Sequence, residues 1–310
     1  MKVLFHYAAG PDLMGRLAAL PGLDIAICPE GQDERLVELL AETEVLWHVL
    51  QPCTAALIAA APRLRLIQKI GVGVNTIDLQ AAATRGIPVC NLPGTNARAV
   101  AELTLALMLA TIRRLPRFDS GLRQGIWSDP LLQDGLGELG GRTVGLVGYG
   151  AVPRILAPVL RAMGCDVIYT SREPKPGAVG ERVPFDVLLA KADVVSLHVP
   201  LTDETAEMLD AAAIARMKEG AVLINTARGG LVNQAALINA LRSGRLGAAG
   251  LDVFAREPLA PNEPLCSLAN VVLTPHVAWL TRGTFERSFA IAVENCRRLL
   301  AHEELLHRVI

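Results

Sequence analysis

Three side chains that suit the handling of an anion and a proton each stand just beyond a predicted buried strand. They are Arg228, Glu257 and His276. The carboxyl ends of parallel strands share one edge of a sheet, and ligands bind beyond that edge. An arginine offers a planar fork to a carboxylate, and an imidazole with a carboxylate beside it can donate and accept a proton. Each residue alone could equally be a surface cation, a turn residue or a structural histidine, but the three together predict a catalytic site.

A glycine-rich turn supplies a second chemical signature. The predicted strand 143–147 runs into Gly148-Tyr149-Gly150-Ala151-Val152-Pro153 and then into a helical pattern. Gly148 permits a tight turn, Gly150 permits close approach to a phosphate, and free N–H groups at the helix start face the anion. A Rossmann fingerprint has Gly or Ala where this chain has Pro153, but proline costs little in a first helical turn. With the three polar residues on the same rim, the turn predicts a dinucleotide site.

Strand-like and helix-like segments alternate along the chain, which is typical of parallel α/β sheets. Near the start, strands are expected at 3–7, 45–49, 66–69 and 89–91, and helices at 33–41 and 54–61. A long apolar helix is expected at 96–113, followed by an irregular stretch with Trp127 and Pro130. Beyond it, six strands are expected at 143–147, 166–170, 194–198, 221–225, 248–252 and 271–273, and helices at 151–163, 210–217, 234–243 and 282–301.

This alternation predicts two doubly wound parallel-sheet domains with a cleft between them. Residues 98–283 are expected to form a Rossmann domain that binds the dinucleotide. Residues 1–97 and 284–310 are expected to form a flavodoxin-like substrate domain, because the last helix is expected to pack back on the first sheet.

Composition excludes several other classes. The 310 residues are 51% hydrophobic and 20% charged with a net charge of −1, so no basic surface predicts nucleic-acid binding. The six cysteines form no C-x-x-C pair, and neither a metal site nor a disulfide framework is expected. The longest uncharged apolar stretch, 103–112, is far too short to span a membrane. A soluble, cytoplasmic protein that acts on a small molecule is therefore expected.

Blocks spread over nearly the whole chain resemble the D-isomer-specific 2-hydroxyacid dehydrogenase family. The pattern is most similar to NADP-preferring glyoxylate/hydroxypyruvate reductases. The blocks are Gly71-Val72-Gly73-Val74-Asn75-Thr76-Ile77-Asp78, Asn91-Leu92-Pro93-Gly94, Ala99-Val100-Ala101-Glu102-Leu103-Thr104, the glycine turn, His198-Val199-Pro200-Leu201-Thr202, Asn225-Thr226-Ala227-Arg228-Gly229, Gly250-Leu251-Asp252-Val253-Phe254 with Glu257-Pro258, and Pro275-His276.

The resemblance implies hydride transfer between NAD(P)H and a small 2-keto acid, with glyoxylate or hydroxypyruvate favoured. His276 would then be the general acid and base, oriented by Glu257, while Arg228 binds the substrate carboxylate. The backbone amides of Val72 and Gly73 would hold the same carboxylate. Trp279 is expected either to wall the substrate pocket or to be a core aromatic.

The second strand of the predicted Rossmann domain bears on the choice of nicotinamide. An NAD site usually has an acid at its end, but here Ser171 stands there and Arg172 follows. Loss of the acid removes repulsion against a 2′-phosphate, and the arginine supplies a partner for it, so NADP is expected. Glu173 could replace the acid, which keeps NAD possible. The predicted cofactor contacts are Thr104, Gly148, Tyr149, Gly150, Ala151, Val152, Ser171, Arg172, His198, Val199, Pro200, Thr205, Thr226, Ala227, Asp252 and Ala278.

Other interpretations remain open. Corepressors of the C-terminal-binding-protein type share this pattern and use the nucleotide mainly to dimerise, and formate dehydrogenases are a second alternative. The end of the chain at Ile310 argues against an interaction tail and against the extended phosphoglycerate dehydrogenases. A homodimer is expected through the cofactor domain, by the 96–113 helix and the Trp127 loop. Lys69 either adds positive potential near Gly71 or is an ordinary snorkelling lysine, with its stem buried and its charge in water.

Overall fold

The computed structural model describes all residues 1–310, which divide into two compact units. Unit 1 comprises Met1–Asn96 together with Thr281–Ile310, and unit 2 comprises Ala97–Leu280. No helix in either unit is both long enough and apolar enough to cross a membrane.

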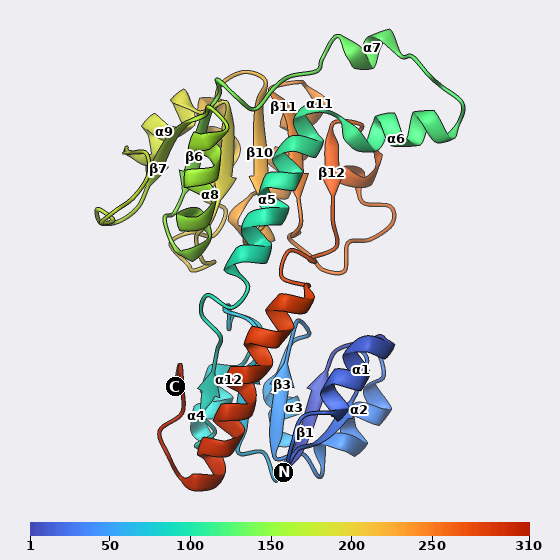
Figure 1. Ribbon diagram of the computed structural model, residues 1–310, viewed down its shortest axis with the longest axis vertical. Helices are drawn as coiled ribbons and strands as arrows, with labels where there is room; N and C mark the ends of the chain where they lie inside the picture. Colours follow the sequence, from blue (N-terminus) through green and yellow to red (C-terminus); the bar gives the residue numbers. More distant parts are fainter. The chain divides into compact units, whose positions relative to one another are not determined.

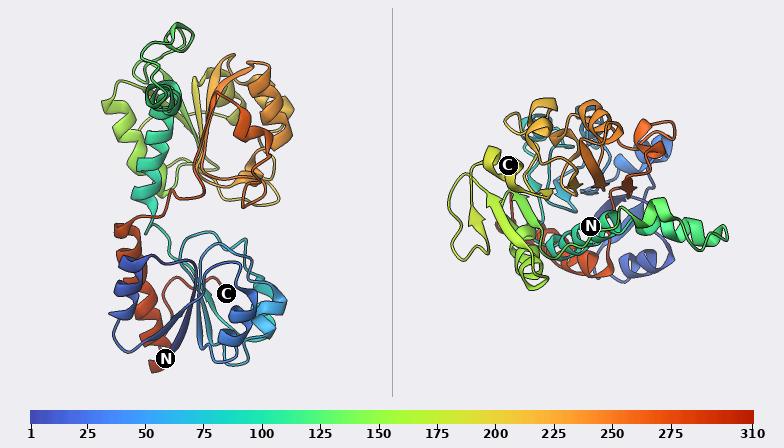
Figure 2. Two further views of the ribbon diagram at one scale, coloured as in Figure 1. Left: turned by 90° about the vertical axis from the view of Figure 1, so that its right-hand side faces the viewer. Right: turned by 90° about the horizontal axis from the view of Figure 1, so that it is seen from above.

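Unit 1 is built on a parallel sheet of five strands in the order β2-β1-β3-β4-β5. Helices cover both faces of this sheet (Figure 2). The order is that of a flavodoxin-like doubly wound fold, as predicted. The elements are β1 (Lys2–His6), α1 (Pro11–Ala18), β2 (Asp24–Ile27), α2 (Asp33–Leu40), β3 (Val45–His48), α3 (Ala55–Ala59), β4 (Leu66–Lys69), α4 (Leu79–Thr84), β5 (Val89–Cys90) and α12 (Arg282–Ala301).

Unit 2 contains a parallel sheet of seven strands in the order β12-β11-β10-β9-β6-β7-β8 (Figure 1). The strand order reverses between β6 and β9, which makes the carboxyl ends of these strands the expected place for a dinucleotide. The elements are α5 (Ala97–Ile112), α6 (Leu115–Arg123), α7 (Pro130–Gln133), β6 (Thr143–Val147), α8 (Ala151–Ala162), β7 (Asp166–Thr170), β8 (Glu181–Arg182), α9 (Phe185–Lys191), β9 (Val194–Leu197), α10 (Ala211–Arg216), β10 (Ala221–Asn225), the 3₁₀ turn Gly229–Leu231, α11 (Gln234–Arg242), β11 (Leu246–Leu251), the 3₁₀ turn Pro264–Ser267 and β12 (Val271–Leu273).

Both doubly wound sheets are as predicted, but the expectation of six strands in the Rossmann sheet was wrong. The seventh strand, β8, has only two residues, and both are exposed at the sheet edge. The stretch predicted to be irregular contains α6 and α7. Helix α6 has no buried side chain and therefore lies outside the core of unit 2.

Residues 281–310, the second segment of unit 1, pack on the sheet that residues 1–96 form. Phe289 of α12 stacks on Trp47 with ring centroids 5.4 Å apart, so this helix covers the core of the first sheet. Beyond the helix, the chain pairs with the outer edge of β5. The amide of Asn91 donates to the carbonyl of His307 over 3.1 Å, and the amide of Val309 donates to the carbonyl of Val89 over 2.7 Å. The edge of the sheet is thereby closed.

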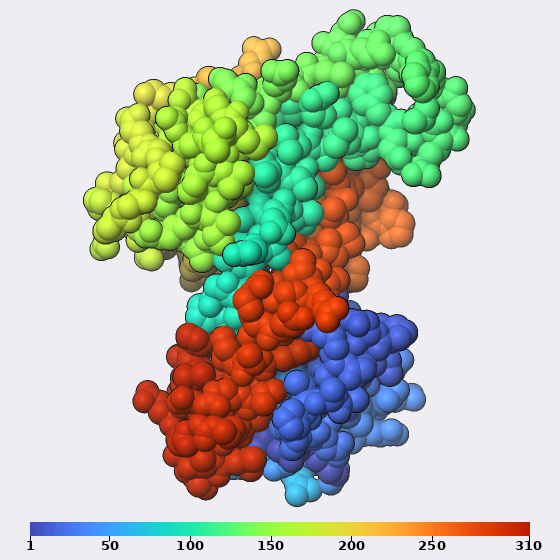
Figure 3. Space-filling model, viewed as in Figure 1, coloured from blue at the N-terminus to red at the C-terminus, as the bar shows by residue number.

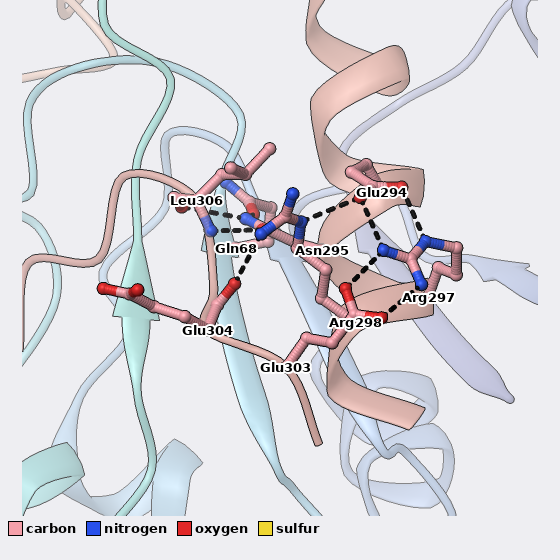
Figure 4. A network of polar contacts seen from close by, with 8 residues as sticks. All are labelled: Gln68, Glu294, Asn295, Arg297, Arg298, Glu303, Glu304 and Leu306. Carbon is pink, nitrogen blue, oxygen red and sulfur yellow. Dashed lines mark hydrogen bonds and ion pairs between the residues drawn. The ribbon is translucent and has the colours of Figure 1, made fainter. Parts of the chain in front are cut away.

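A buried amide holds this return segment in place (Figure 4). Asn295 of α12 is fully buried. Its Nδ2 donates to Gln68 Oε1 over 2.7 Å and to the Leu306 carbonyl over 3.1 Å, while its Oδ1 accepts from the Leu306 amide over 2.8 Å. Nearby, Arg297 forms ion pairs with Glu294 and Glu303 on the surface. Buried hydrogen bonds that lose one partner are costly, whereas exposed ion pairs contribute little.

Asn295→Ala is expected to destabilise unit 1 by about 2–4 kcal/mol, because it leaves one buried and two partly buried polar groups without their partner. Arg297→Gln, in the adjacent surface network, serves as the control and should change stability little. Urea denaturation followed by circular dichroism measures both. Equal losses for the two variants would contradict this assignment.

Candidate active site

The three predicted catalytic residues lie on loops that follow three neighbouring strands of unit 2. Arg228 follows β10, Glu257 follows β11 and His276 follows β12. Because these strands are parallel and adjacent, their carboxyl ends deliver all three loops to one edge of the sheet.

Glu257 and His276 form a direct pair. Glu257 Oε2 lies 2.6 Å from His276 Nδ1, and Glu257 Oε1 accepts from the Phe254 amide over 2.9 Å. Burial raises the pKa of the Glu257 carboxyl, but the bond and charge of His276, the Phe254 amide and the Arg228 charge outweigh it. The net pKa of Glu257 is therefore below its usual range. An ionised carboxylate at Nδ1 orients the ring and leaves Nε2 for a ligand.

Asp252 holds the loop that carries His276. Its side chain is fully buried, and its carboxylate accepts from Thr274 Oγ1 over 2.6 Å and from the amides of Val277 and Ala278, each over 2.9 Å. Burial raises the pKa of Asp252 despite these bonds. His276 itself has a left-handed backbone with φ of 55°. The Asp252 carboxylate therefore lies inside the protein, although the residue directly follows the end of β11.

Trp279 supports the same loop from the other side. Its indole is buried, and Nε1 donates to the His276 carbonyl over 3.0 Å. This contact gives Trp279 a positioning role that neither sequence-based interpretation included.

The loop that carries Arg228 is shaped by Asn225 and Gly229. Asn225 is buried, accepts from the Ala227 amide over 3.0 Å and donates to the Arg228 carbonyl over 2.8 Å. A Cβ at Gly229 would lie 1.9 Å from the carbonyl carbon and oxygen of Phe254, so only glycine fits there. Gly229 thus packs the Arg228 loop directly on the loop of Glu257. Burial lowers the pKa of the Arg228 guanidinium, and the charge of Glu257 opposes this shift.

The glycine turn has the geometry that an anion site needs. Gly148 has φ of 93°, and a Cβ there would lie 2.7 Å from the His198 carbonyl oxygen. Gly150 is the N-cap of α8 and provides no capping side chain, so the first amides of the helix are left to a ligand. No atom lies within 4 Å of the position that a Cβ of Gly150 would occupy. This open space and the exposed Ala151 fit a pyrophosphate.

Several other predicted cofactor residues have side chains bonded within unit 2. Tyr149 is buried, and its hydroxyl accepts from the Val179 amide over 2.7 Å. The hydroxyls of Thr104 and Thr226 are 2.9 Å apart, with Thr104 fully buried. Thr205 Oγ1 donates to the Pro200 carbonyl over 2.7 Å and so shapes the loop that also contains Val199. The hydrogen bonds of these side chains hold the loops of unit 2 in shape.

His198 is another predicted cofactor residue, and its imidazole is neutral. Its Nε2 lies 2.9 Å from Ser196 Oγ, and burial lowers the pKa of His198 to about 3. The imidazole therefore adds no positive charge beside Gly148 at neutral pH.

The turn after β7 is held by Arg182, a residue that the sequence did not single out. Arg182 of β8 donates to the Ser171 carbonyl through Nε over 3.1 Å and Nη2 over 2.8 Å, and Nη2 also donates to the Arg172 carbonyl over 2.9 Å. Ser171 Oγ donates to the Glu173 carbonyl over 2.6 Å. Arg172 is exposed. No signal in the sequence marks Arg182, because β8 is too short to show a pattern.

The predicted substrate amides of Val72 and Gly73 lie in unit 1, in the turn that follows β4. Val72 is exposed, and its carbonyl accepts from Asn91 Nδ2 over 2.9 Å. Lys69, at the end of β4, is buried, and its Nζ donates to the Val49 carbonyl and to His48 Nδ1. The alternative of an ordinary snorkelling lysine was wrong, because the ammonium group is bonded inside the protein and does not reach water.

Comparison with known proteins agrees with this geometry. The model of the family described as D-isomer specific 2-hydroxyacid dehydrogenase, NAD binding domain, matches residues 105–278. The glyoxylate reductase of Aeropyrum pernix is 40% identical over 275 residues, which cover 84% of this chain and 81% of that protein. The D-3-phosphoglycerate dehydrogenase of Mycobacterium tuberculosis is 40% identical over 306 residues, which cover 97% of this chain. That match covers 54% of the phosphoglycerate dehydrogenase, so the chain spans about half its length.

Among solved structures, an NADPH-dependent glyoxylate/hydroxypyruvate reductase from Sinorhizobium meliloti, in complex with NADP and malonate, superimposes with a TM-score of 0.84 at 30% identity. The match covers 99% of this chain and 96% of that one. The matched family model, the glyoxylate reductase relative and the fold agree, and the chain belongs to the D-isomer specific 2-hydroxyacid dehydrogenase family.

Proposed function

We propose that this protein reduces a small 2-keto acid, glyoxylate or hydroxypyruvate, to the D-2-hydroxy acid, with NADPH preferred over NADH. The observation that carries the proposal is the 2.6 Å Glu257–His276 pair on loops next to that of Arg228, in the same unit as the glycine turn. The match to a glyoxylate reductase over 84% of this chain supports the substrate class.

His276 acts as the general acid of the reduction. A nicotinamide cofactor held at the glycine turn would supply the hydride for the keto carbon. As the carbonyl double bond becomes a single bond, His276 Nε2–H donates its proton to the oxygen, and the product is the hydroxy acid. In the reverse direction Nε2 accepts the hydroxyl proton. Glu257 remains ionised because its pKa is lowered, and its carboxylate stabilises the imidazolium through Nδ1–H.

Arg228 binds the substrate carboxylate and polarises the keto oxygen. A guanidinium stays charged even where burial lowers its pKa, and its planar fork matches a carboxylate. Asn225 and Gly229 hold its backbone from both sides, so the charge is placed before the substrate arrives. In unit 1, the turn of Val72 and Gly73 offers backbone amides to the same kind of anion.

The turn after β7 supports the preference for NADP. Ser171 takes the position of the acid that would repel a 2′-phosphate, and Arg172 is exposed beside it. Arg182 fixes the backbone of both residues and adds a second guanidinium at this turn. The S. meliloti reductase in complex with NADP is consistent with this choice.

The segment of α6 and α7 supports a homodimer that forms through unit 2. It projects from the sheet of unit 2 as a separate arm (Figures 1 and 3). Trp127 is 87% exposed and Leu131 is 85% exposed, while Leu122 and Ile126 of the same arm are also exposed. Exposed apolar side chains gathered on one segment indicate a contact with another protein surface.

A second candidate substrate is the 3-phosphorylated acid of the phosphoglycerate dehydrogenase relatives, because one of them matches 97% of this chain. The reaction and the roles of Arg228, Glu257 and His276 would be the same. Only the contacts to the phosphate group, at the end of the substrate away from its carboxylate, would differ.

Turnover of a panel of keto acids tests the proposed reaction. Glyoxylate, hydroxypyruvate, 3-phosphohydroxypyruvate and pyruvate are each assayed with NADPH and with NADH by nicotinamide absorbance. We expect the highest kcat/KM for glyoxylate or hydroxypyruvate with NADPH. A clear preference for the phosphorylated acid would select the second candidate, and no turnover with any pair would favour a nucleotide-binding module.

Arg172→Ala tests the cofactor preference. We expect kcat/KM for NADPH to fall about 10- to 100-fold, because a charge-assisted bond to the 2′-phosphate is lost, while the value for NADH changes little. Arg242→Ala, an exposed arginine at the far end of α11, is the matched control. Equal effects on both cofactors would contradict this role for Arg172.

Glu257→Gln tests the proton-handling pair. Reduction consumes a proton that His276 Nε2 donates, so its rate falls at high pH. A neutral amide no longer stabilises the imidazolium, so the alkaline limb of kcat/KM should move to lower pH and the rate should fall about 100-fold. Profiles from about pH 5 to about pH 9 are compared with those of Glu219→Gln, an exposed control. An unmoved limb would refute the pairing.

A further inference from the structure

Gln234, the first residue of α11, bonds to two parts of the connection between β11 and β12. Its Oε1 accepts from the Ala255 amide over 3.1 Å, and its Nε2 donates to Glu263 Oε1 over 2.9 Å. The side chain is half-buried and lies on unit 2, as do both its partners. None of the roles described above for substrate, cofactor or proton involves it.

The Ala255 amide, which donates to Gln234, directly follows the Phe254 amide, which donates to Glu257. The Phe254 amide donates to Glu257 Oε1 over 2.9 Å. Two successive N–H groups are therefore bonded, one to Glu257 and one to Gln234. On the other side of the same peptide, a Cβ at Gly229 would lie 2.5 Å from the nitrogen of Ala255. The peptide therefore contacts Gly229 and is hydrogen-bonded by Gln234, and these two contacts restrict its plane and its position.

We propose that Gln234 is a positioning residue that holds the Phe254–Ala255 peptide so that Glu257 presents its second carboxylate oxygen to His276. The inference deepens the proposed function and rests on it. Gln234 acts on the reaction only through Glu257. Its second bond, to Glu263, holds its own amide group in the orientation in which the oxygen faces Ala255.

Loss of the Gln234 side-chain bonds has a specific consequence for the reaction. The Ala255 amide loses its partner, the turn gains freedom, and the bond between Phe254 and Glu257 weakens with it. The carboxylate then stabilises the imidazolium of His276 less well. Reduction becomes slower and its alkaline limb moves to lower pH, whereas the turn after β7 and the binding of the cofactor do not change.

Exchanging the amide of Gln234 and the carboxylate of Glu263 between the two positions tests the positioning role of Gln234. Gln234→Met keeps the length of the side chain and removes both bonds. Gln234→Glu keeps an acceptor for the Ala255 amide but places a carboxylate against Glu263. In the double variant Q234E/E263Q, the introduced carboxylate accepts from Ala255 and the introduced amide donates to it, so both bonds are restored in the opposite sense. Asn239→Ser, exposed on the same helix, is the control.

We expect kcat to fall about 5- to 50-fold in Gln234→Met and Gln234→Glu, with the alkaline limb at lower pH and KM for NADPH within about 2-fold. The double variant should recover wild-type kcat within about 3-fold. Wild-type kcat and an unmoved limb in Gln234→Met would overturn the proposal, and so would a double variant as slow as Gln234→Glu. Circular dichroism and urea denaturation confirm that each variant is folded.

The proton between Glu257 and His276 provides a readout that does not depend on turnover. A short bond of this kind gives a far-downfield proton NMR signal, which Glu257→Gln should abolish and so assign. The signal should weaken or shift in Gln234→Met and return in the double variant. If the wild type reduces no keto acid but the signal follows Gln234, the positioning role stands and the proposed function fails. An unchanged signal in Gln234→Met would refute the positioning role whatever the activity.

Discussion

The hydrogen bond between Glu257 and His276 requires two separate loops to be held at a fixed separation. At 2.6 Å this bond tolerates little movement, and its two residues follow different strands of the sheet. Parallel pairing of β11 with β12 brings the loops to the same edge, but it does not orient the side chains. The remaining order comes from further polar contacts within and between the loops, and most of these contacts bond backbone groups.

These supporting contacts differ in kind from one loop to the next. Asp252 holds the His276 loop through backbone amides and a threonine hydroxyl, and its burial keeps water away from those bonds. Asn225 shapes the loop of Arg228, and Gly229 permits that loop to touch the loop of Glu257. Arginine, glutamate and histidine are thus placed by residues that carry out no chemistry themselves, which is the arrangement expected of a preorganised site.

The sequence was sufficient for the fold class and for the loops of Arg228, Glu257 and His276, because buried parallel strands have clear apolar runs and their ends define the site. It was insufficient where the structure depends on contacts between distant segments. Arg182 belongs to a two-residue exposed strand without any pattern, and its bonds to Ser171 and Arg172 leave no mark on the sequence. The sequence likewise could not distinguish a buried Lys69 from an exposed one, because the groups that surround its ammonium come from His48 at the end of β3 and from Val49 after it.

The pairing of residues 307–309 with the edge of β5 has a consequence for synthesis of the chain. Unit 2 is continuous, whereas unit 1 lacks its covering helix and its edge partner until residues 281–310 have been translated. On the ribosome, unit 2 can therefore complete its fold while the first ninety-six residues still expose Trp47 and the open edge of β5. Residues 1–96 are translated first, but their unit completes its fold last. Until residues 281–310 are translated, these residues are the part of the nascent chain most in need of a chaperone.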